Sequence, residues 1–386
     1  MQAIAALDLF DDDLVQKLAD CRRELRAEYQ EPHDHPWIIG YSGGKDSTVV
    51  VHLVLELLLD LPRSERRRPV HIVANDTLVE SPLVVGHIKR TMARFDEAAA
   101  ALRLPVETRI TAPKLDHGFW VNLIGRGYPA PSRSFRWCTD RMKIQPTSDY
   151  IKQQASQTGE VILLLGVRRE ESAARAARAL RYDRESGGAR LNAHNDLTGC
   201  WVFRPILDLT TDEVWEFLGA TPAPWGGSHA ELVQLYRNAQ GGECPVVTQK
   251  SDVPSCGTSS SRFGCWTCTV VAKDRSLEGF VEAGFAEFGP LLAFRDWLVE
   301  IRDQDGRRSN RRRNGEVTHL PTGELVRGPF TIETRREILD RLLALQEQVG
   351  QALITKDELQ RIRAIWAEDI ATHAERMTKR HSVKTI

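Results

Sequence analysis

The stretch 37–47, with the sequence WIIGYSGGKDS, constrains the fold more than any other part of this 386-residue chain. Trp37 to Tyr41 form an apolar run that predicts a buried strand, and Thr48 to Leu61 have the apolar content and length of a buried helix. The two glycines between them therefore lie at a strand-to-helix turn. Backbone N–H groups are unpaired at a helix N-terminus, which is a common place for phosphate groups to bind.

The residues of the turn suit a phosphate ligand. Gly43 and Gly44 have no Cβ and can adopt positive φ, so the backbone can close on phosphate oxygens. The turn is not a Walker A loop, because that pattern needs glycine where Ile39 stands and Ser or Thr where Asp46 stands. Three side chains of the turn add hydrogen-bond donors: Ser42, Lys45 and Ser47.

The run from Ser42 to Ser47 resembles the SGGxDS loop of the PP-loop ATP pyrophosphatase superfamily. Members of that superfamily cleave ATP between the α and β phosphates. The resemblance implies that the loop binds the departing pyrophosphate, with Lys45 among its catalytic residues. It also implies that Asp46 serves either a Mg²⁺ ion or the geometry of the loop.

Further strands and helices follow in a repeated order that predicts an α/β fold with a doubly wound, mainly parallel sheet. Val70 to Ala74 and Val106 to Ile110 read as strands, with a long helix from Pro82 to Leu102 between them. Ligands bind at the carboxyl ends of parallel strands, so Asp76 and Thr77 are candidates to contact adenosine. A simple turn at this point is the alternative.

A second loop is expected at the same edge of the sheet. The stretch 160–172, EVILLLGVRREES, is an apolar strand that runs into Gly166 and Arg168, which places Arg168 near the phosphates. A helix is predicted over 169–180. Another helix, preceded by a short extended piece at Pro205, is predicted to begin near Thr210 to Asp212.

These motifs together resemble the PAPS reductase-like branch of the PP-loop superfamily, over about residues 38–218. The resemblance implies that ATP is held between the glycine loop, the strand end at Asp76 and the Gly166-x-Arg168 loop. The motifs that carry it are Arg136, Cys138, Arg141 and Pro146; Gly166-x-Arg168-x-x-Glu171-Ser172; Pro205-Ile206; and Asp212-x-Val214-Trp215.

The cysteines predict a metal centre. Two thiolates three residues apart can converge on one metal, and Cys256, Cys265 and Cys268 have the spacing C-x8-C-x2-C. Cys138 brings the number to four, which saturates either a 4Fe-4S cluster or a zinc ion. Arg136, Arg141 and Lys143 surround Cys138 in the sequence, so we expect its thiol pKa to be lowered.

The cysteine motifs resemble those of the DndC and SspD families of DNA phosphorothioation proteins. Those motifs are Arg136-Trp137-Cys138, Cys256, Gly264-Cys265-Trp266-x-Cys268 and Gly328-Pro329-Phe330. The likeness implies a 4Fe-4S cluster on the four cysteines, cleavage of ATP to AMP and pyrophosphate, and DNA as the substrate. It also implies a cysteine desulfurase and other proteins of the phosphorothioation system as partners. Whether Cys138 is a ligand or carries a persulfide stays open, as does the choice between DndC and SspD.

Three other functions are compatible with the sequence: a PAPS or APS reductase, a tRNA thiolase, and a nucleotide-gated iron–sulfur scaffold. Against the reductase, its family carries the catalytic cysteine in a C-terminal Glu-Cys-Gly tail, and no cysteine follows Cys268 here. A structural zinc site is the alternative to the cluster.

Charge and hydropathy limit the kinds of partner and the cellular location that the sequence allows. Lys and Arg (52) nearly balance Asp and Glu (53), so a nucleic-acid site would have to be a local patch. The run 302–313, with six arginines, is either a solvated loop or such a patch. No secretory signal or membrane span is evident, so a cytoplasmic protein is expected. The predicted divisions are an N-terminal helix and linker (1–36), the PP-loop domain (37–220), a cysteine-containing, Arg-rich region (221–330) and a helical region (331–386).

Overall fold

The computed structural model describes the backbone of residues 11–171, 191–239 and 263–383, and their side chains as far as 371 except that of Glu171. The chain forms two compact units and passes between them repeatedly. The sheet unit comprises residues 1–76, 81–111 and 146–263, and the helical unit comprises 77–80, 112–145 and 264–386. The division of the chain predicted from the sequence stays a prediction.

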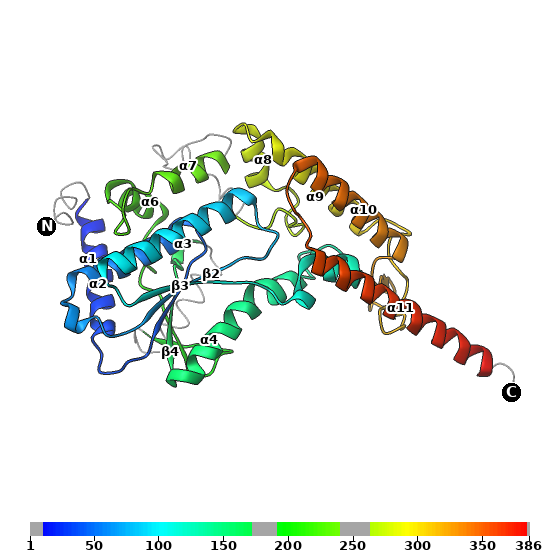
Figure 1. Cartoon of the computed structure of the whole chain (residues 1–386), viewed down its shortest axis with the longest axis horizontal. Helices are drawn as coiled ribbons and strands as arrows, with labels where there is room; N and C mark the ends of the chain where they lie inside the picture. Colours follow the sequence, from blue (N-terminus) through cyan, green and yellow to red (C-terminus); the bar gives the residue numbers. More distant parts are fainter. Residues whose placement is uncertain (1–10, 172–190, 240–262, 384–386) are drawn as a thin grey trace. The chain divides into compact units, whose positions relative to one another are not determined.

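A six-stranded sheet forms the centre of the sheet unit, in the order β3-β2-β1-β4-β6-β5 (Figure 1). All neighbours pair in parallel except β5 and β6, which are antiparallel. The predicted α/β fold with a mainly parallel sheet is thereby confirmed. The strands are β1 (Trp37–Gly40), β2 (Val70–Asn75), β3 (Val106–Thr111), β4 (Val161–Leu164), β5 (Asn192–Ala193) and β6 (Cys200–Phe203).

Helices cover both faces of this sheet, because side chains alternate along each strand. On β1, Trp37 and Ile39 face a large core shared with several helices, whereas Ile38 faces a smaller core that includes Ile151. The helices of the large core are α1 (Asp12–Tyr29), α2 (Lys45–Asp60), α3 (Pro82–Leu102), α6 (Thr211–Ala220) and α7 (Ala230–Ala239); α4 (Gln145–Thr158) packs on the other face.

Helix ends in this unit follow local sequence signals. Helix α3 has Pro82 in its first turn, where the missing N–H costs nothing. Helix α6 begins with a capping box, in which Thr210 accepts from the Glu213 N–H and the Glu213 carboxylate accepts from the Thr210 N–H. The cap near Thr210 is thus as predicted, but the strand lies at Cys200–Phe203, before Pro205 and not at it. The helix predicted over 169–180 falls mostly outside the described residues.

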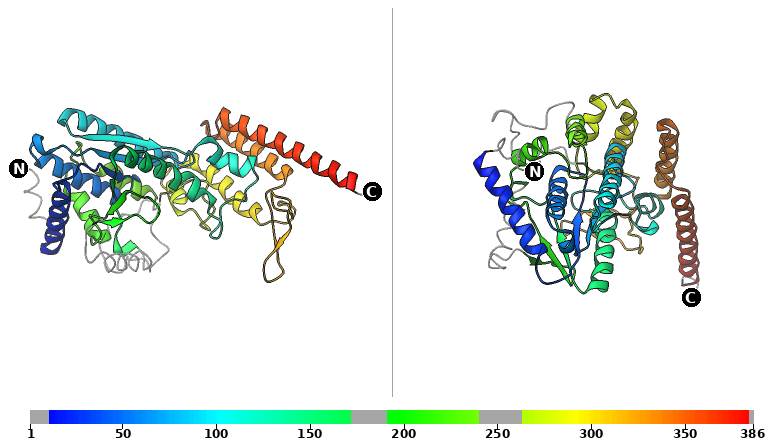
Figure 2. Two further views of the ribbon diagram at one scale, coloured as in Figure 1. Left: turned by 90° about the horizontal axis from the view of Figure 1, so that it is seen from below. Right: turned by 60° about the vertical axis from the view of Figure 1, so that its left-hand side comes forward.

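The helical unit is built on four longer helices and a small hairpin (Figure 2). Helix α9 packs on α10, and both α10 and α11 contact a π-helical turn at Val121–Gly125. The indole N–H of Trp120 donates to the Leu353 carbonyl at 2.7 Å, and that of Trp366 donates to the Ile124 carbonyl. The elements are α8 (Arg275–Glu282), α9 (Gly289–Arg302), α10 (Ile332–Val349), α11 (Lys356–Val383), β7 (Thr318–His319) and β8 (Leu325–Val326).

The helical C-terminal region expected from the sequence is present as α10 and α11. Within the described ranges, no helix is both long and apolar enough to cross a membrane.

Candidate functional site

The glycine loop lies between β1 and the first turn of α2. Gly43 has φ +73°, and a Cβ there would stand 2.6 Å from Cγ1 of Ile88, so only glycine fits. Ser47 holds the loop from inside, since its hydroxyl accepts from the Ser42 N–H at 3.2 Å and donates to the Gly44 carbonyl at 3.0 Å. The Thr48 N–H makes the first helical bond, to Gly44. The N–H groups that precede it are the ones at which the sequence predicts an anion to bind.

The loop after β4 is locked against this turn. A Cβ on Gly166 would lie 2.8 Å from the Asp46 carbonyl carbon and 2.9 Å from the Ser47 nitrogen. Beyond it, Arg168 is almost fully buried, and its Nε donates to Oδ1 of Asp46 at 2.7 Å. The other oxygen of Asp46 accepts from Nζ of Lys45 at 3.0 Å. The structure therefore brings together Lys45, Asp46, Gly166 and Arg168, as expected for neighbouring parallel strands.

The Asp46 carboxylate fits a positioning role better than a metal site. Both of its oxygens are paired with cations, one with Arg168 and one with Lys45. A Mg²⁺ ion would have to displace at least one of these cations. The contacts instead hold two positive side chains beside the anion site, so we derive no step through Mg²⁺.

The strand end after β2 is divided between the two units. Asp76 belongs to the sheet unit, where its N–H donates to the Thr111 carbonyl at 2.8 Å and its carboxylate lies 3.7 Å from Nζ of Lys89. Thr77 belongs to the helical unit and is fully buried. Its hydroxyl bonds to Glu80 at 3.1 Å and contacts the Cys265 sulfur at 3.2 Å. The adenosine contacts expected of Asp76 and Thr77 stay predictions.

Three of the four predicted cluster cysteines lie in the helical unit: Cys138, Cys265 and Cys268. The Cys268 N–H donates to the Cys265 carbonyl at 2.9 Å. Cys256 lies outside the described residues. In the part of the chain that is described, no three His, Cys, Asp or Glu residues are grouped to hold a metal ion.

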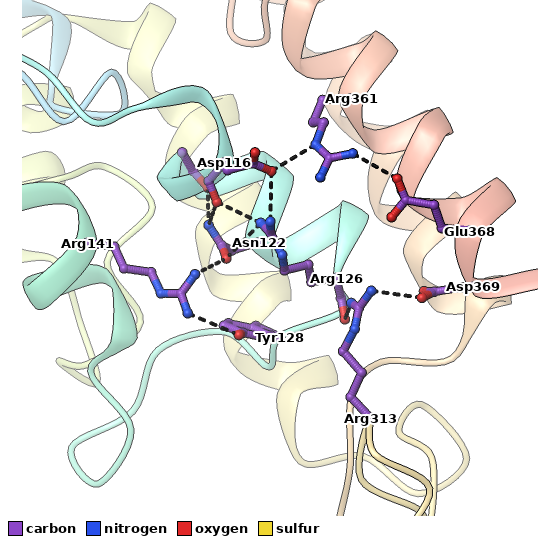
Figure 3. A network of polar contacts seen from close by, with 10 residues as sticks. Asp116, Asn122, Arg126, Tyr128, Arg141, Arg313, Arg361, Glu368 and Asp369 are labelled. Atoms are coloured by element: carbon purple, nitrogen blue, oxygen red, sulfur yellow. Dashed lines mark hydrogen bonds and ion pairs between the residues drawn. The ribbon is translucent and has the colours of Figure 1, made fainter. Parts of the chain in front are cut away.

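The expectation that basic neighbours lower the Cys138 pKa is wrong. Burial comes first and the Cys268 charge second, and together they raise the pKa of Cys138 despite the opposing effect of Lys143. Arg141 is occupied elsewhere, because it donates to Oδ1 of Asn122 at 2.9 Å and to the Tyr128 hydroxyl at 3.2 Å (Figure 3). Arg141 is therefore close to Cys138 in the sequence, but its charge does not lower the pKa of that thiol.

Burial likewise raises the pKa of the Cys265 thiol, and the Glu80 carboxylate adds to the effect. The thiol lies 3.6 Å from Oε1 of Glu80, which is also 3.5 Å from Nζ of Lys143. Cys265 and then Glu80 raise the pKa of Lys143. Cysteine sulfur is a usual ligand of both iron–sulfur clusters and zinc, so the three cysteines are chemically suited to either metal centre.

The sequence did not reveal two residues of these sites, Tyr236 and Glu80. The hydroxyl of Tyr236, on α7, accepts from the Lys45 N–H at 3.3 Å. Glu80 contacts both Thr77 and Cys265. No local pattern marks either residue, since 191 residues separate Tyr236 from Lys45 and 185 separate Cys265 from Glu80.

Residues 36–271 match the family model of the phosphoadenosine phosphosulfate reductase domain, which is more than half of the chain. The chain belongs to this family. This agrees with the nucleotide-utilising domain inferred from the glycine loop, and it covers the segments that carry Cys138, Cys265 and Cys268. The matched residues include most of the sheet unit and part of the helical unit.

Two uncharacterized proteins of Methanocaldococcus jannaschii are similar in sequence, at 27% identity over 178 residues and 23% over 190. The alignments cover 46% and 49% of this chain and 34% and 32% of the relatives. The chain therefore spans about a third of the length of the curated relatives it matches.

Two solved structures with a similar fold are distant in sequence. A phosphoadenylyl-sulfate reductase of Candida auris in a phosphate complex has 14% identity and a TM-score of 0.34, over 53% of this chain and 82% of that one. The U34-tRNA thiolase of Methanococcus maripaludis, solved with its 4Fe-4S cluster, has 15% identity and a TM-score of 0.32, over 58% and 72%. We draw no functional conclusion from likenesses this distant.

Proposed function

We propose that this protein is an iron–sulfur ATP pyrophosphatase and sulfurtransferase that prepares a DNA backbone phosphate for replacement of a non-bridging oxygen by sulfur. The observation that carries the proposal is the presence, in one chain of the reductase-domain family, of a phosphate loop flanked by Lys45 and Arg168 and of three partly buried cysteines, Cys138, Cys265 and Cys268. DNA phosphorothioation is the finer part of the proposal. It rests on the likeness of the cysteine motifs to DndC and SspD proteins.

The chemistry needs adenylation because oxide is a very poor leaving group. A non-bridging oxygen of the DNA phosphate attacks the α phosphate of ATP, and pyrophosphate leaves. That oxygen now belongs to an AMP leaving group. A hydrosulfide-level nucleophile then displaces AMP at the DNA phosphorus, so sulfur enters and the oxygen departs with AMP.

The residues of the sheet unit act on the first of these steps. The N–H groups of the glycine loop, with Ser42, Ser47 and Lys45, hold the departing pyrophosphate. Arg168 offsets the charge that develops on the phosphates, and Asp46 fixes both cations in advance. Because Asp46 holds both cations in place, little reorganisation is needed when charge develops on the phosphates.

If all four cysteines, Cys138, Cys256, Cys265 and Cys268, held a 4Fe-4S cluster, the cluster would be saturated and would supply a structural or electron-transfer centre. If Cys138 carries a persulfide instead, the other three cysteines would hold the cluster and one iron would be open to sulfur. A cysteine desulfurase would deliver the sulfur as a persulfide, and a two-electron reductant such as a dithiol would release it at the hydrosulfide level. Other proteins of a phosphorothioation system would take part in this delivery.

Nucleotide products test the activity. The full chain is incubated with labelled ATP, and AMP and pyrophosphate are measured with DNA, with tRNA, with adenylyl sulfate compounds or with no acceptor. We expect AMP formation that DNA stimulates and that Ser47→Ala lowers at least tenfold. Stimulation by tRNA alone would point to a thiolase, and reduction of sulfonucleotide without AMP formation from ATP would point to a reductase. Turnover unaffected by Ser47→Ala would remove the loop from the mechanism.

Metal analysis tests the cluster separately. After purification without oxygen, we expect about four irons and four sulfides per chain, and loss of both in Cys265→Ser. Cys21→Ser is the matched control, because Cys21 is buried in the sheet unit and belongs to its apolar core. One zinc and no sulfide would exclude the cluster and leave the ATP reaction to be judged alone.

A further inference from the structure

The hydroxyl of Tyr236 lies at the N-terminus of helix α2, beside the backbone N–H groups of the glycine loop. It accepts a hydrogen bond from the Lys45 N–H at 3.3 Å, and a Cβ placed on Gly44 would lie 3.1 Å from it. Tyr236 comes from α7, far along the chain, yet all of these residues belong to the sheet unit. The phenol is therefore part of the wall of the phosphate loop.

This hydroxyl has a proton left to donate. Its oxygen serves as the acceptor for Lys45, and among the described residues no acceptor takes its own O–H. Burial raises the pKa of Tyr236, so the phenol keeps this proton throughout the neutral range. Tyr236 is partly buried, and a donor without an acceptor costs free energy to the extent that it is shielded from water, unless a ligand completes it.

The ring of Tyr236 is fixed by its neighbours. Trp215 meets it edge-on with centroids 4.8 Å apart, and Phe263 does so at 4.5 Å. Nζ of Lys45 lies 6.0 Å from the ring centroid, on the side of the loop. The hydroxyl thus cannot turn away from the loop without breaking the ring contacts with Trp215 and Phe263.

We propose that Tyr236 is a phosphate-binding residue, which donates its phenol proton to an oxygen of the pyrophosphate moiety of a nucleoside triphosphate held in the glycine loop. The inference rests on the proposed function for its ligand, and it adds a residue that no loop motif contains. Tyr236 thereby joins the loop N–H groups and Lys45 as a donor to the same group.

The test is calorimetric titration of the full chain with inorganic pyrophosphate, with α,β-methylene ATP and with AMP. Tyr236→Phe removes the hydroxyl and keeps the ring. We expect it to weaken binding of pyrophosphate and of the ATP analogue by about 10-fold to 100-fold, the value of one hydrogen bond to a charged group. AMP binding should be unchanged, and the thermal midpoint should show that the variant is folded.

Tyr150→Phe is the matched control. The Tyr150 hydroxyl bonds to Nδ1 of His71 at 3.1 Å in the same unit, so this variant loses one phenol hydroxyl away from the loop and should bind as the wild type does. Equal binding by Tyr236→Phe and wild type overturns the proposal. So does tighter binding, which would mean that the phenol blocks the site, and so does a wild-type protein that binds no pyrophosphate.

The outcome is separable from that of the proposed function. If the wild type binds pyrophosphate, Tyr236→Phe weakens it, and no AMP is formed from ATP under any condition, then the phosphate role of Tyr236 stands and the pyrophosphatase function fails. If AMP forms but Tyr236→Phe leaves binding unchanged, the reverse holds.

Discussion

Arg168 shows how one buried charge can serve both stability and the site. Its guanidinium is 2% exposed and donates to Asp46, to the Leu209 carbonyl and to the Thr211 hydroxyl. Removing Arg168 would take one of its two cations from the Asp46 carboxylate, leaving only the Lys45 pair, and would take a donor from the buried Leu209 carbonyl. The residue that we assign to the phosphates is therefore also one on which the fold depends.

We accordingly expect Arg168→Ala to lower the free energy of unfolding by about 3–5 kcal/mol, as is typical of broken buried pairs. Urea unfolding followed by circular dichroism measures it. Arg23→Ala is the control, since Arg23 is 66% exposed and its pair with Asp20 should contribute less than about 1 kcal/mol. Similar losses in the two variants would contradict the assignment of Arg168 to a buried network.

A second buried group, His229, makes stability depend on pH. Its Nε2 lies 3.1 Å from Nδ1 of His52, whose Nε2 lies 3.1 Å from the Glu56 carboxylate. Burial, and next the His52 charge, lower the pKa of His229 to about 3. An unfolded histidine has a pKa of about 6.5. Between these values the unfolded chain binds the proton more readily than the folded one does.

The stability that the neutral His229 provides is therefore complete above about pH 6.5 and is lost as the pH falls toward 3, by up to about 1.4 kcal/mol per pH unit. Urea unfolding at pH 7.5, 6.0 and 5.0 measures the slope. His229→Gln should flatten it relative to the wild type, whereas His319→Gln, which changes an exposed histidine of the hairpin, should not. A slope unchanged in His229→Gln would show that other groups dominate.

At the residue scale, the sequence was sufficient only where neighbours in the chain make the site. Ser42 to Ser47 were found because their chemistry is contiguous, and Arg168 because parallel strands end at a common edge. Tyr236, Glu80 and the His52–His229 pair were missed. Their partners are distant in sequence, and nothing local distinguishes a tyrosine at a phosphate loop from one in a core. The Cys138 pKa was predicted in the wrong direction for the same reason, since burial depends on the tertiary fold.

Among the elements, the junction of β4 with α2 depends on close approach of two backbones. Gly166 has no Cβ because the Asp46 and Ser47 backbone atoms stand less than 3 Å from where it would be. Backbone atoms in a helix turn cannot give way as a flexible side chain can. Substituting Gly166 should therefore move the Arg168 loop away from the glycine loop.

We expect Gly166→Ala to destabilise the protein by about 1–3 kcal/mol, the usual cost of overpacking, and to weaken pyrophosphate binding. Thermal unfolding and calorimetric titration measure the two effects. Gly219→Ala serves as the control, because this glycine lies within α6 and a Cβ there would meet nothing within 4 Å. Alanine at 219 should be neutral or stabilise by up to about 1 kcal/mol. If both variants behave alike, the close approach has no energetic consequence.

Elements were predicted well where a clear period or cap exists. The apolar runs at 37–41, 70–74 and 106–110 are strands, and Pro82 begins a helix that ends at Leu102. The extended piece was predicted at Pro205, whereas the strand is Cys200–Phe203. This four-residue apolar segment is too short to show the alternation that identifies a strand. The π-helical turns at Val121–Gly125 and Thr139–Ile144 have no sequence signature at all.

At the scale of the whole molecule, the arginine run 302–313 proves to be largely internal to the helical unit. Arg313 donates to the Arg126 carbonyl and to Asp369 on α11, as Figure 3 shows. Arg307 pairs with Glu337 on α10. Arg302 donates to the Pro131 and Thr269 carbonyls, and Arg308 to the Arg327 and Gly328 carbonyls. Most of the run thus joins segments of this unit, which neither sequence-based alternative anticipated.

Arg311, Arg312 and Arg313 are all exposed, but Arg313 is paired with Asp369. Arg311 donates only to the nearby Gly315 carbonyl, and the Arg312 backbone bonds to Glu316. If the proposed DNA substrate is held partly by this loop, these two guanidinium groups are the ones that can contact phosphates. The sequence alone could not separate them from their neighbours, because partners in α10 and α11 decide which arginines are occupied.

We therefore expect Arg311→Gln/Arg312→Gln to weaken duplex DNA binding and to reduce the slope of log K against log salt by about 1.8, since each lost phosphate contact contributes about 0.9. Fluorescence anisotropy from 50 to 200 mM salt, on the order of the range in which such contacts are strongly screened, gives both quantities. Arg63→Gln/Arg67→Gln removes the same charge from two exposed arginines of the sheet unit and should leave the slope unchanged. Equal slopes in the two double variants would mean that overall charge, and not a defined contact, governs DNA binding. The argument for a DNA site on this loop would then fail. The role proposed for the phosphate loop would be unaffected.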